Sequence, residues 1–276
     1  MEQKQEQDND DDLAVLTPEF VGVSVSVTAS EPNHAKVTAC DTGVASDTPV
    51  RAVRRNRTPS ILRLLPKRVL QDVNRLDAVN TALMRFYRWP IVGRMYRRRV
   101  EMCLDECTGG QRILEVGFGV GLTFPNLTEE YDEIHGVDLD ANVHEVAAMH
   151  RSLGIATHLE NGNVLDLRFR DGAFDTVLLI SILEHLRPEE LSRAFAEIKR
   201  VLKPGGQVVY GVPIERPFMV LMFRMLGWDC RKLHFSTEHD VRSAARAELT
   251  EVRVEQMQSY PPIFGAVYEV GHFVSR

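Results

Sequence analysis

The residues best suited to chemistry form a short glycine turn. Residues 115–121 read Glu-Val-Gly-Phe-Gly-Val-Gly and end an apolar run that is typical of a buried strand. Gly117, Gly119 and Gly121 allow sharp bends and leave no Cβ between the backbone and a ligand. In an open α/β sheet such a turn lies at the carboxyl edge, where ligands bind. The turn therefore predicts a binding loop, although a tight connection without a ligand would use the same residues.

An acidic residue at the end of the next strand indicates the kind of ligand. Asp138 follows Gly117 by 21 positions, and a carboxylate there can accept hydrogen bonds from both hydroxyls of a ribose. The dinucleotide fingerprint would place its third glycine where this sequence has Leu122. The loop and the acid predict a nucleoside site that is not a typical NAD site. Capping a helix is the alternative role for Asp138.

Strands and helices that alternate from Gln111 onward must position this loop. We expect strands at 112–116, 134–138, 157–160, 174–180 and 207–212, and helices at 142–151 and 188–202. The run 174–180 is almost continuously apolar, as in a strand covered on both faces. Residues 203–206, Lys-Pro-Gly-Gly, are signals that stop the second helix. The alternation predicts an open, mostly parallel α/β sheet.

The C-terminal part departs from this alternation. Thr237 and Asp240 predict the capped start of a helix that runs to about Ala247. Strands at 252–258 and 267–274 follow, and their connection is too short for a parallel crossover, so they should be antiparallel neighbours. Residues 213–235 are an insertion rich in Met and Phe. We interpret it as a lid over an apolar or flat substrate, with a core helix on the sheet as an equal alternative.

Charge divides the chain into three parts. Residues 1–50 carry two basic and ten acidic residues, whereas residues 51–100 carry fourteen basic and two acidic ones. We expect 1–58 to be a disordered acidic tail, 59–107 to be a basic segment of two or three amphipathic helices, and 108–276 to be the α/β domain. For the basic segment we rank a solvated helical lid first, an anionic membrane surface second and nucleic acid third. Association with the acidic tail or with an acidic surface of the domain is a further alternative.

Composition argues against a secreted, fibrous, collagenous or integral-membrane protein. With 44% hydrophobic and 26% charged residues, the chain is typical of soluble globular proteins, and no apolar stretch is long enough to span a membrane. Four cysteines without a paired framework and an acidic start, unlike a secretory signal, predict a cytoplasmic location. Cys103 and Cys107 lack the clustered partners of a metal site, so no metal is expected. The loop 117–121 lacks a P-loop lysine, and there is no Ser-His-Asp motif.

Together these motifs resemble those of class I S-adenosylmethionine-dependent methyltransferases, in the methyltransferase type 11 group related to ubiquinone and menaquinone biosynthesis. The matching stretches are 113–121, 136–138, 162–169, 174–177, 183–186 and 200–206. The resemblance covers residues 111–212 and the closing antiparallel pair, and the motifs are specific for the family but say little about the substrate. The resemblance implies a Rossmann-like, seven-stranded, mostly parallel sheet with a reversed last strand in three αβα layers. It also implies S-adenosylmethionine as methyl donor and S-adenosylhomocysteine as product.

The resemblance assigns the loop and its neighbours to the cofactor. Gly117, Gly119 and Gly121 would shape the loop beside the methionine part of S-adenosylmethionine. Glu115 would lie under that loop and orient its backbone or a water near the methionyl amine. Asp138 would bind the ribose hydroxyls.

Further residues would surround the adenine and the sulfonium. Leu139 would pack on the adenine, and Asn163, at a position where aspartate is more usual, would accept a hydrogen bond from the adenine amino group. Val164 would add a backbone contact, and Ile180 and Ser181 would line the floor near the sulfonium. Leu139 and Val164 could instead be ordinary core, and Asn163 could simply make a turn.

Methyl transfer needs few catalytic groups from the protein, because a sulfonium methyl is already activated. Holding the acceptor in line with the methyl group can provide much of the rate enhancement. A hydroxyl or a carbon acid also needs a general base. Candidates are His185 after the fourth strand and Tyr210 near the end of the fifth, with His234 and His239 in the region that would cover the pocket. A structural role is the alternative for each.

These observations predict a methyltransferase that acts on a small, apolar or aromatic molecule. One alternative is a catalytically silent methyltransferase fold that serves as a binding or scaffold protein. Another is a methyltransferase that acts on lipid at a membrane surface, with residues 59–107 in peripheral contact with an anionic membrane. A nucleotide-sugar or NAD enzyme is disfavoured by the spacing at Leu122, and the sequence does not indicate the oligomeric state.

Overall fold

The computed structural model describes residues 60–66, 87, 92–214, 234–259 and 265–276. The predicted tail 1–58, most of the predicted lid 213–235 and the helices predicted before Ile91 lie outside these residues, apart from 60–66 and Tyr87. Residues 60–66 have no regular secondary structure. The last of the predicted basic helices is α3, Val92–Glu106.

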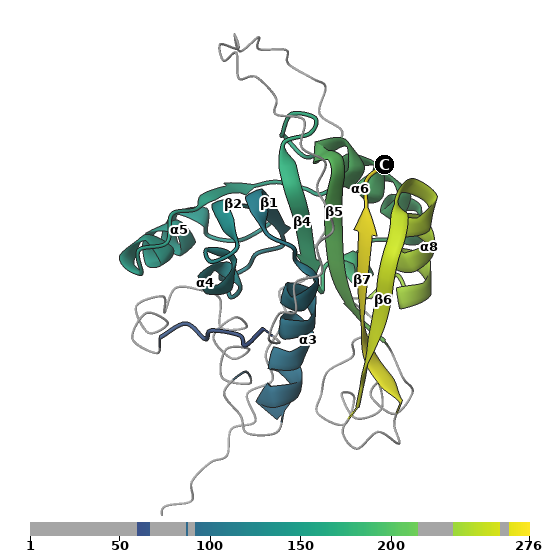
Figure 1. The fold of residues 1–276 in the computed structure, drawn as a ribbon, viewed down its shortest axis with the longest axis horizontal. Helices are drawn as coiled ribbons and strands as arrows, with labels where there is room; N and C mark the ends of the chain where they lie inside the picture. Colours follow the sequence, from purple (N-terminus) through teal and green to yellow (C-terminus); the bar gives the residue numbers. More distant parts are fainter. Residues whose placement is uncertain (1–59, 67–86, 88–91, 215–233, 260–264) are drawn as a thin grey trace, which may run out of the picture. The chain divides into compact units, whose positions relative to one another are not determined.

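The described residues form one seven-stranded sheet in the order β3-β2-β1-β4-β5-β7-β6 (Figure 1). The strands are β1 Gly110–Val116, β2 Tyr131–Asp138, β3 His158–Asn161, β4 Phe174–Ile180, β5 Leu202–Pro213, β6 Thr250–Gln258 and β7 Ala266–Val274. Pairing is parallel from β3 through β5, and β7 runs antiparallel to both β5 and β6. The predicted mostly parallel sheet with a reversed last strand is confirmed, and so is the antiparallel pair β6–β7.

Helices cover both faces of the sheet and give the predicted αβα layers. Side chains alternate along each strand, so Ile113 and Leu114 enter different apolar cores. The core around Ile113 contains residues of α3, of α4 (Phe124–Leu127) and of α5 (Val143–Ser152). The core around Leu114 contains residues of α6 (Pro188–Val201) and α8 (Glu238–Glu248). The carboxyl ends of β1, β2 and β4 therefore meet at one edge between these layers.

Side-chain caps fix where two of the helices begin. At α8 the Thr237 hydroxyl accepts from the Asp240 amide at 3.3 Å, and the Asp240 carboxylate accepts from the Thr237 amide at 2.9 Å. This is the capping box predicted from these two residues. At α5 the Asn142 side chain accepts from the Glu145 amide at 3.3 Å.

Strand β5 starts earlier than the sequence predicted. Helix α6 ends at Val201, as its stop signals indicate, but the chain enters the sheet at once and Leu202 pairs with Phe174. Lys203 Nζ lies 2.8 and 2.9 Å from the two carboxylate oxygens of Asp175 on β4. Gly205 has a φ of +74° and its amide donates to the Ser275 carbonyl. These bonds make 203–206 part of the strand.

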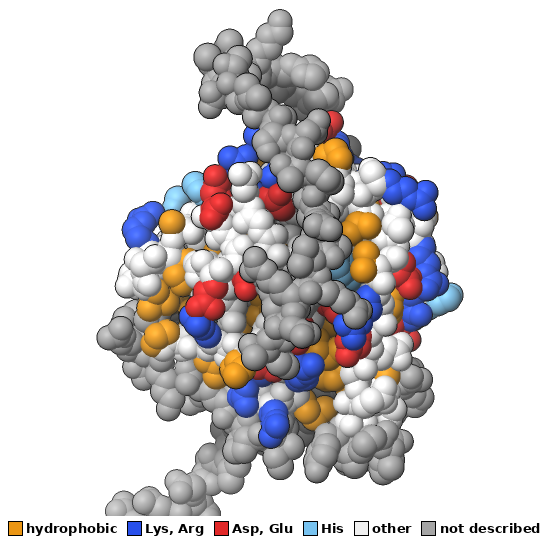
Figure 2. Space-filling model, in the orientation of Figure 1, with side chains coloured by type: hydrophobic (Ala, Val, Ile, Leu, Met, Phe, Trp, Pro, Cys, Tyr) orange, Lys and Arg blue, Asp and Glu red, His pale blue; other side chains and the backbone are white. Residues whose placement is uncertain are grey.

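The segment 60–66 lies along α3 and α4. The Leu62 amide donates to Glu101 on α3, and Asn126 on α4 donates to the Ile61 carbonyl at 2.9 Å. Leu62 and Leu65 are buried in the core below. Across the described surface that faces the viewer in Figure 2, acidic and basic side chains are interspersed. Within the described ranges, no helix has the length and apolarity needed to cross a bilayer.

Candidate functional site

The glycine loop leaves β1 with three left-handed glycines. Gly117, Gly119 and Gly121 have φ values of 74°, 54° and 67°. A Cβ on Gly117 would lie 2.0 Å from the Ile182 Cδ1 atom, so the Ile182 side chain would have to shift to make room for it. A Cβ on Gly119 would meet nothing within 4 Å. Because Gly119 faces open space, its backbone is the part of the loop that a ligand can approach.

Asp138 lies beside that bare backbone. Its Oδ2 accepts a hydrogen bond from the Gly119 amide at 2.8 Å, and its Oδ1 accepts from the amides of Asp140 and Ala141 at 3.0 and 2.9 Å. The loop and the acid predicted from their spacing are thus in direct contact. A carboxylate has about four lone-pair positions, and three donors already use it. A ribose with two hydroxyls would have to displace at least one of these bonds. The structure shows the turn-capping role of Asp138, and its ribose role stays a prediction.

Glu115 is buried under the loop. Its exposed fraction is 4%, and one carboxylate oxygen accepts a hydrogen bond from the Thr123 hydroxyl. Burial raises the pKa of Glu115 to about 8, against the opposing effect of the Thr123 bond, and the nearby Asp138 charge raises it further. Glu115 therefore links the start of the loop to its end at Thr123. The predicted contact with a water near the methionyl amine stays a prediction.

His150, which the sequence did not single out, supports the loop from below. It is fully buried on α5, and its Nε2 donates to the Val120 carbonyl at 2.9 Å. Its ring lies 4.8 Å from the ring of Phe124, and a Cβ on Gly121 would collide with its Nε2 at 2.5 Å. Burial lowers the pKa of His150, so the ring is neutral at pH 7. In the sequence, His150 is a single histidine on an amphipathic helix, and no motif around it indicates a contact with the loop.

The predicted adenine contacts have mixed surroundings. Leu139 is 51% exposed beside Asp138, which leaves it free to cover a flat ring. Val164 is buried in the core with α6 and α8, so only its backbone could reach a ligand. The Asn163 side chain accepts from the Leu165 amide at 3.0 Å. This is the turn that was the alternative role for Asn163. It uses one of the two lone pairs of the carbonyl oxygen, so the predicted contact with the adenine amino group stays a prediction.

The floor of the site is strained at the end of β4. Ser181 follows Ile180 and, with a φ of 58°, is the only non-glycine residue with a positive φ among the described residues. Such strain persists only where the surrounding structure fixes it, and it gathers at functional sites. The Ser181 hydroxyl lies 3.0 Å from the Tyr268 hydroxyl, and its amide donates to the Gly211 carbonyl. Tyr268, which the sequence analysis did not name, is therefore part of this floor.

The general-base candidates separate in the structure. His185 is exposed in the short helix η1 (Leu183–His185) directly after β4, and its ring lies 5.2 Å from that of His234. His239 is exposed on α8. The prediction that Tyr210 is a general base needs correction. Tyr210 is fully buried between Phe195 and Phe273 in the core with α6 and α8. A hydroxyl enclosed in that core cannot meet an acceptor.

Arg99 is a second residue that the sequence did not single out. It lies on α3 with its guanidinium 4.1 Å from the Tyr96 ring centre and 5.2 Å from that of Tyr268. Within the described part of the chain its Nε has no hydrogen-bond partner. That nitrogen is buried, and the guanidinium is held by its contacts with the two rings. Tyr268 connects it to Ser181 and so to the floor of the site.

Metal donors are closer together than the sequence suggested. No clustered histidines are visible along the chain, but the fold brings residues from separate elements together. Two groups of three donors have ligand atoms within 4.8 Å of one another: Glu133, His135 and His158, and Glu184, His185 and His234. The second group borders the site after β4, and the first lies on β2 and β3.

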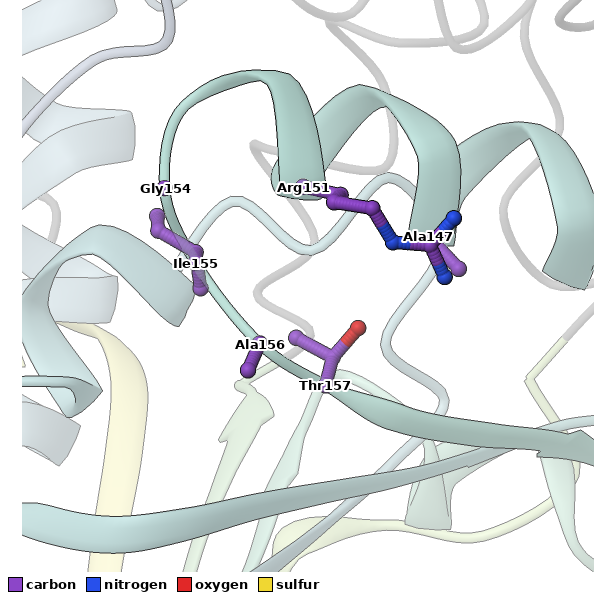
Figure 3. A pocket seen from close by; sticks show the side chains of 6 residues that line it. All are labelled: Ala147, Arg151, Gly154, Ile155, Ala156 and Thr157. Atoms are coloured by element: carbon purple, nitrogen blue, oxygen red, sulfur yellow. The ribbon is translucent and has the colours of Figure 1, made fainter.

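A shallow hollow outside the site is lined by residues from the end of α5 to the start of β3 (Figure 3). Arg151 and Thr157 border it, and its volume is about 260 Å³. Pockets for small ligands usually measure about 300–1,000 Å³. Because the hollow lies where β3 begins, it is at the edge opposite the carboxyl ends of the strands, and it is not the candidate site.

A family comparison agrees with this geometry. Residues 114–210 match the family model described as a methyltransferase domain. Residues 114–210 thus have the sequence pattern of a methyltransferase domain. The match starts in β1 before the glycine loop and ends in β5, so it includes the loop, Asp138 and η1.

Curated relatives match the chain over part of its length. A demethylmenaquinone methyltransferase of Tropheryma whipplei is 30% identical over 114 residues, which is 41% of this chain and 46% of the relative. A ubiquinone biosynthesis O-methyltransferase of Alkalilimnicola ehrlichii is 32% identical over 127 residues, 44% of this chain and 50% of the relative. The chain thus spans about half the length of these relatives.

Solved structures extend the likeness in fold. The N-methyltransferase NodS of Bradyrhizobium japonicum, solved with S-adenosylhomocysteine, has a TM-score of 0.55 at 18% identity and covers 75% of this chain and 98% of NodS. The PH0226 protein of Pyrococcus horikoshii also gives a TM-score of 0.55, at 20% identity, over 67% of this chain and 92% of that protein. At these identities the likeness shows the fold of the methyltransferase domain.

Proposed function

We propose that this protein transfers the methyl group of S-adenosylmethionine to a small, apolar or aromatic acceptor. The observation that carries the proposal is the contact between Asp138 and the bare backbone of Gly119 at the carboxyl edge of the sheet. An acid and an open loop at this edge suit an adenosine with an amino-acid tail. The curated relatives named for methyl transfer support the same reaction.

The residues present fit S-adenosylmethionine. Asp138 would bind the ribose, exposed Leu139 would cover the adenine, and Gly119 would let the methionine part pass over the loop. When bound, the cofactor supplies an electrophilic methyl group, and transfer in line to the acceptor leaves S-adenosylhomocysteine.

The protein's remaining task is to place the acceptor and remove its proton. The acceptor atom forms a bond to the methyl carbon as the carbon–sulfur bond breaks, and the proton of the acceptor goes to a base or to water. His185 is the proposed base, because it is exposed at the end of β4 near the strained floor. Phe235, which is 52% exposed, offers aromatic surface to a flat acceptor.

Calorimetry with S-adenosylhomocysteine tests the cofactor part of the proposal. We expect saturable binding of one S-adenosylhomocysteine per chain that NAD does not displace. Displacement by NAD, or no binding, would contradict it. Profiling of cell extracts with a methyl-labelled cofactor then tests transfer: a labelled small molecule that requires the protein is expected. Binding without transfer to any acceptor would instead favour the silent binding protein.

We also propose that the protein is cytoplasmic and that its basic segment 59–107, ranked first as a solvated helical lid, has peripheral contact with anionic membranes as its second-ranked role. The support is the charge of residues 51–100, with fourteen basic and two acidic residues. Flotation with anionic liposomes at low salt is expected to carry the protein to the lipid fraction, and high salt to release it. No binding at low salt would contradict this contact.

A further inference from the structure

Three potential metal ligands project from two neighbouring strands, away from the methyltransferase site. Glu133 and His135 are two residues apart on β2, so their side chains leave the same face of the sheet. His158 is the first residue of β3 and pairs directly with His135 in the parallel register. The two imidazole rings are stacked, with centres 4.7 Å apart and planes at 20°.

The distances suit coordination of one ion. His135 Nε2 and Glu133 Oε2 are 3.3 Å apart. Two ligands bound to zinc at about 2.0–2.1 Å in a tetrahedral arrangement are separated by about 3.3–3.4 Å. The nearest donor atom of His158 lies within 4.8 Å of both, and this side chain is exposed. A rotation of His158 can therefore bring the third donor to the ion, with water in the fourth position.

Neighbouring side chains hold the first two donors in place. The His135 ring is packed edge-on against Phe174 and Phe169, with ring centres 5.2 and 6.1 Å away. Arg112 Nε and Nη2 donate to the two Glu133 oxygens at 2.8 and 3.3 Å. Arg112 fixes the carboxylate, and its positive charge also opposes a cation, so we expect moderate affinity.

We propose that Glu133, His135 and His158 bind a transition-metal ion such as Zn²⁺ at a site separate from methyl transfer. Two imidazoles and one carboxylate favour Zn²⁺, Ni²⁺ or Cu²⁺, whereas Mg²⁺ prefers ligands that are all oxygen. Because β3 is the end strand and pairs with β2, the ion would join the edge strand to the sheet. The other end of the same strand pair carries Asp138 opposite Asn161.

The test is calorimetry with Zn²⁺ on the full-length, untagged protein and single-residue variants. His158→Ala is the decisive change, because His158 is exposed and its removal leaves the core intact. His144→Ala, an exposed histidine on α5, is the matched control. His185→Ala removes a donor from the second group. Co²⁺ absorption provides an independent readout, since tetrahedral coordination gives intense visible bands.

We expect His158→Ala to weaken Zn²⁺ binding by about tenfold or more, the scale of changes in metal-site surroundings, and to abolish the tetrahedral Co²⁺ bands. His144→Ala and an excess of Mg²⁺ should leave this binding unchanged. Equal Zn²⁺ affinity in wild type and His158→Ala, or binding that is lost only in His185→Ala, would overturn the proposal. So would the absence of Zn²⁺ binding in the wild type.

Discussion

Adding a single methyl group at Gly117 tests how the loop is packed. Gly117 has a φ of 74°, a conformation that costs an L-residue about 1–2 kcal/mol. The new Cβ would also lie 2.0 Å from Ile182 Cδ1 and 2.5 Å from Ile182 Cγ1. Overpacking of this kind costs about 1–3 kcal/mol. We therefore expect Gly117→Ala to lower the free energy of unfolding by about 2–5 kcal/mol.

Gly119→Ala is the matched control on the same loop. Its φ of 54° imposes a similar backbone cost, but its Cβ would meet nothing within 4 Å. We expect a loss of only about 1–2 kcal/mol in the free energy of unfolding. Gly119→Ala should instead weaken S-adenosylhomocysteine binding, because the methyl group would occupy the space that the loop leaves open.

Urea unfolding followed by circular dichroism measures both variants on the full chain. The double variant Gly117→Ala with Ile182→Ala removes the collision, so the two changes should couple favourably by about 1–3 kcal/mol. Equal destabilisation by Gly117→Ala and Gly119→Ala, together with no coupling to Ile182, would refute the packing argument.

Three further changes test other parts of the structure. His150→Phe keeps a ring against Phe124 but removes the donor to the Val120 carbonyl. Calorimetry should therefore show that the affinity for S-adenosylhomocysteine falls by about 1 kcal/mol. An unchanged affinity would argue that His150 does not support the loop. The pKa of Glu115 is raised by burial from 4.5 to about 8. The folded state therefore holds a proton that the unfolded state lacks in this window, and stability should fall as pH rises through it, by at most about 1.4 kcal/mol per pH unit. Glu115→Gln should remove that slope in urea unfolding, and a slope equal to wild type would count against the burial effect. Arg242→Met leaves the fully buried Glu269 carboxylate without its two guanidinium bonds of 3.1 and 2.6 Å. Thermal unfolding should show that the free energy of unfolding falls by about 3–5 kcal/mol. Adding Glu269→Gln should recover part of this loss, and a single variant as stable as wild type would contradict the importance of the pair.

Much of the fold follows from local patterns in the sequence. The apolar run 174–180 and the capping residues Thr237 and Asp240 predicted β4 and the start of α8, because burial on both faces and helix capping leave direct marks on residue types. The early start of β5 was missed, because residues 203–206 contain Pro and Gly. Their place in the sheet depends on Asp175 and Ser275, which are distant in sequence.

The candidate site was predictable where one sequence motif determines both where a residue lies in the fold and which way it faces. The glycine loop and Asp138 have a characteristic spacing, and the structure brings them into contact. Tyr210 was wrong because β5 is apolar on both sides, so its pattern does not tell which face a side chain takes. His150 and Tyr268 act through elements that approach only in the folded chain, and no spacing in the sequence connects them to the loop or to Ser181.

The central claim is that Asp138 and the glycine loop hold the adenosine part of the methyl donor. The most direct measurement is calorimetry with S-adenosylhomocysteine on wild type, Asp138→Ala and Asp140→Ala, a neighbouring exposed acid that keeps its backbone amide. Asp138→Ala should lose about 1–3 kcal/mol of binding free energy, the scale for hydrogen bonds to a charged group, while Asp140→Ala should bind like wild type. Equal affinities for all three proteins would contradict the claim.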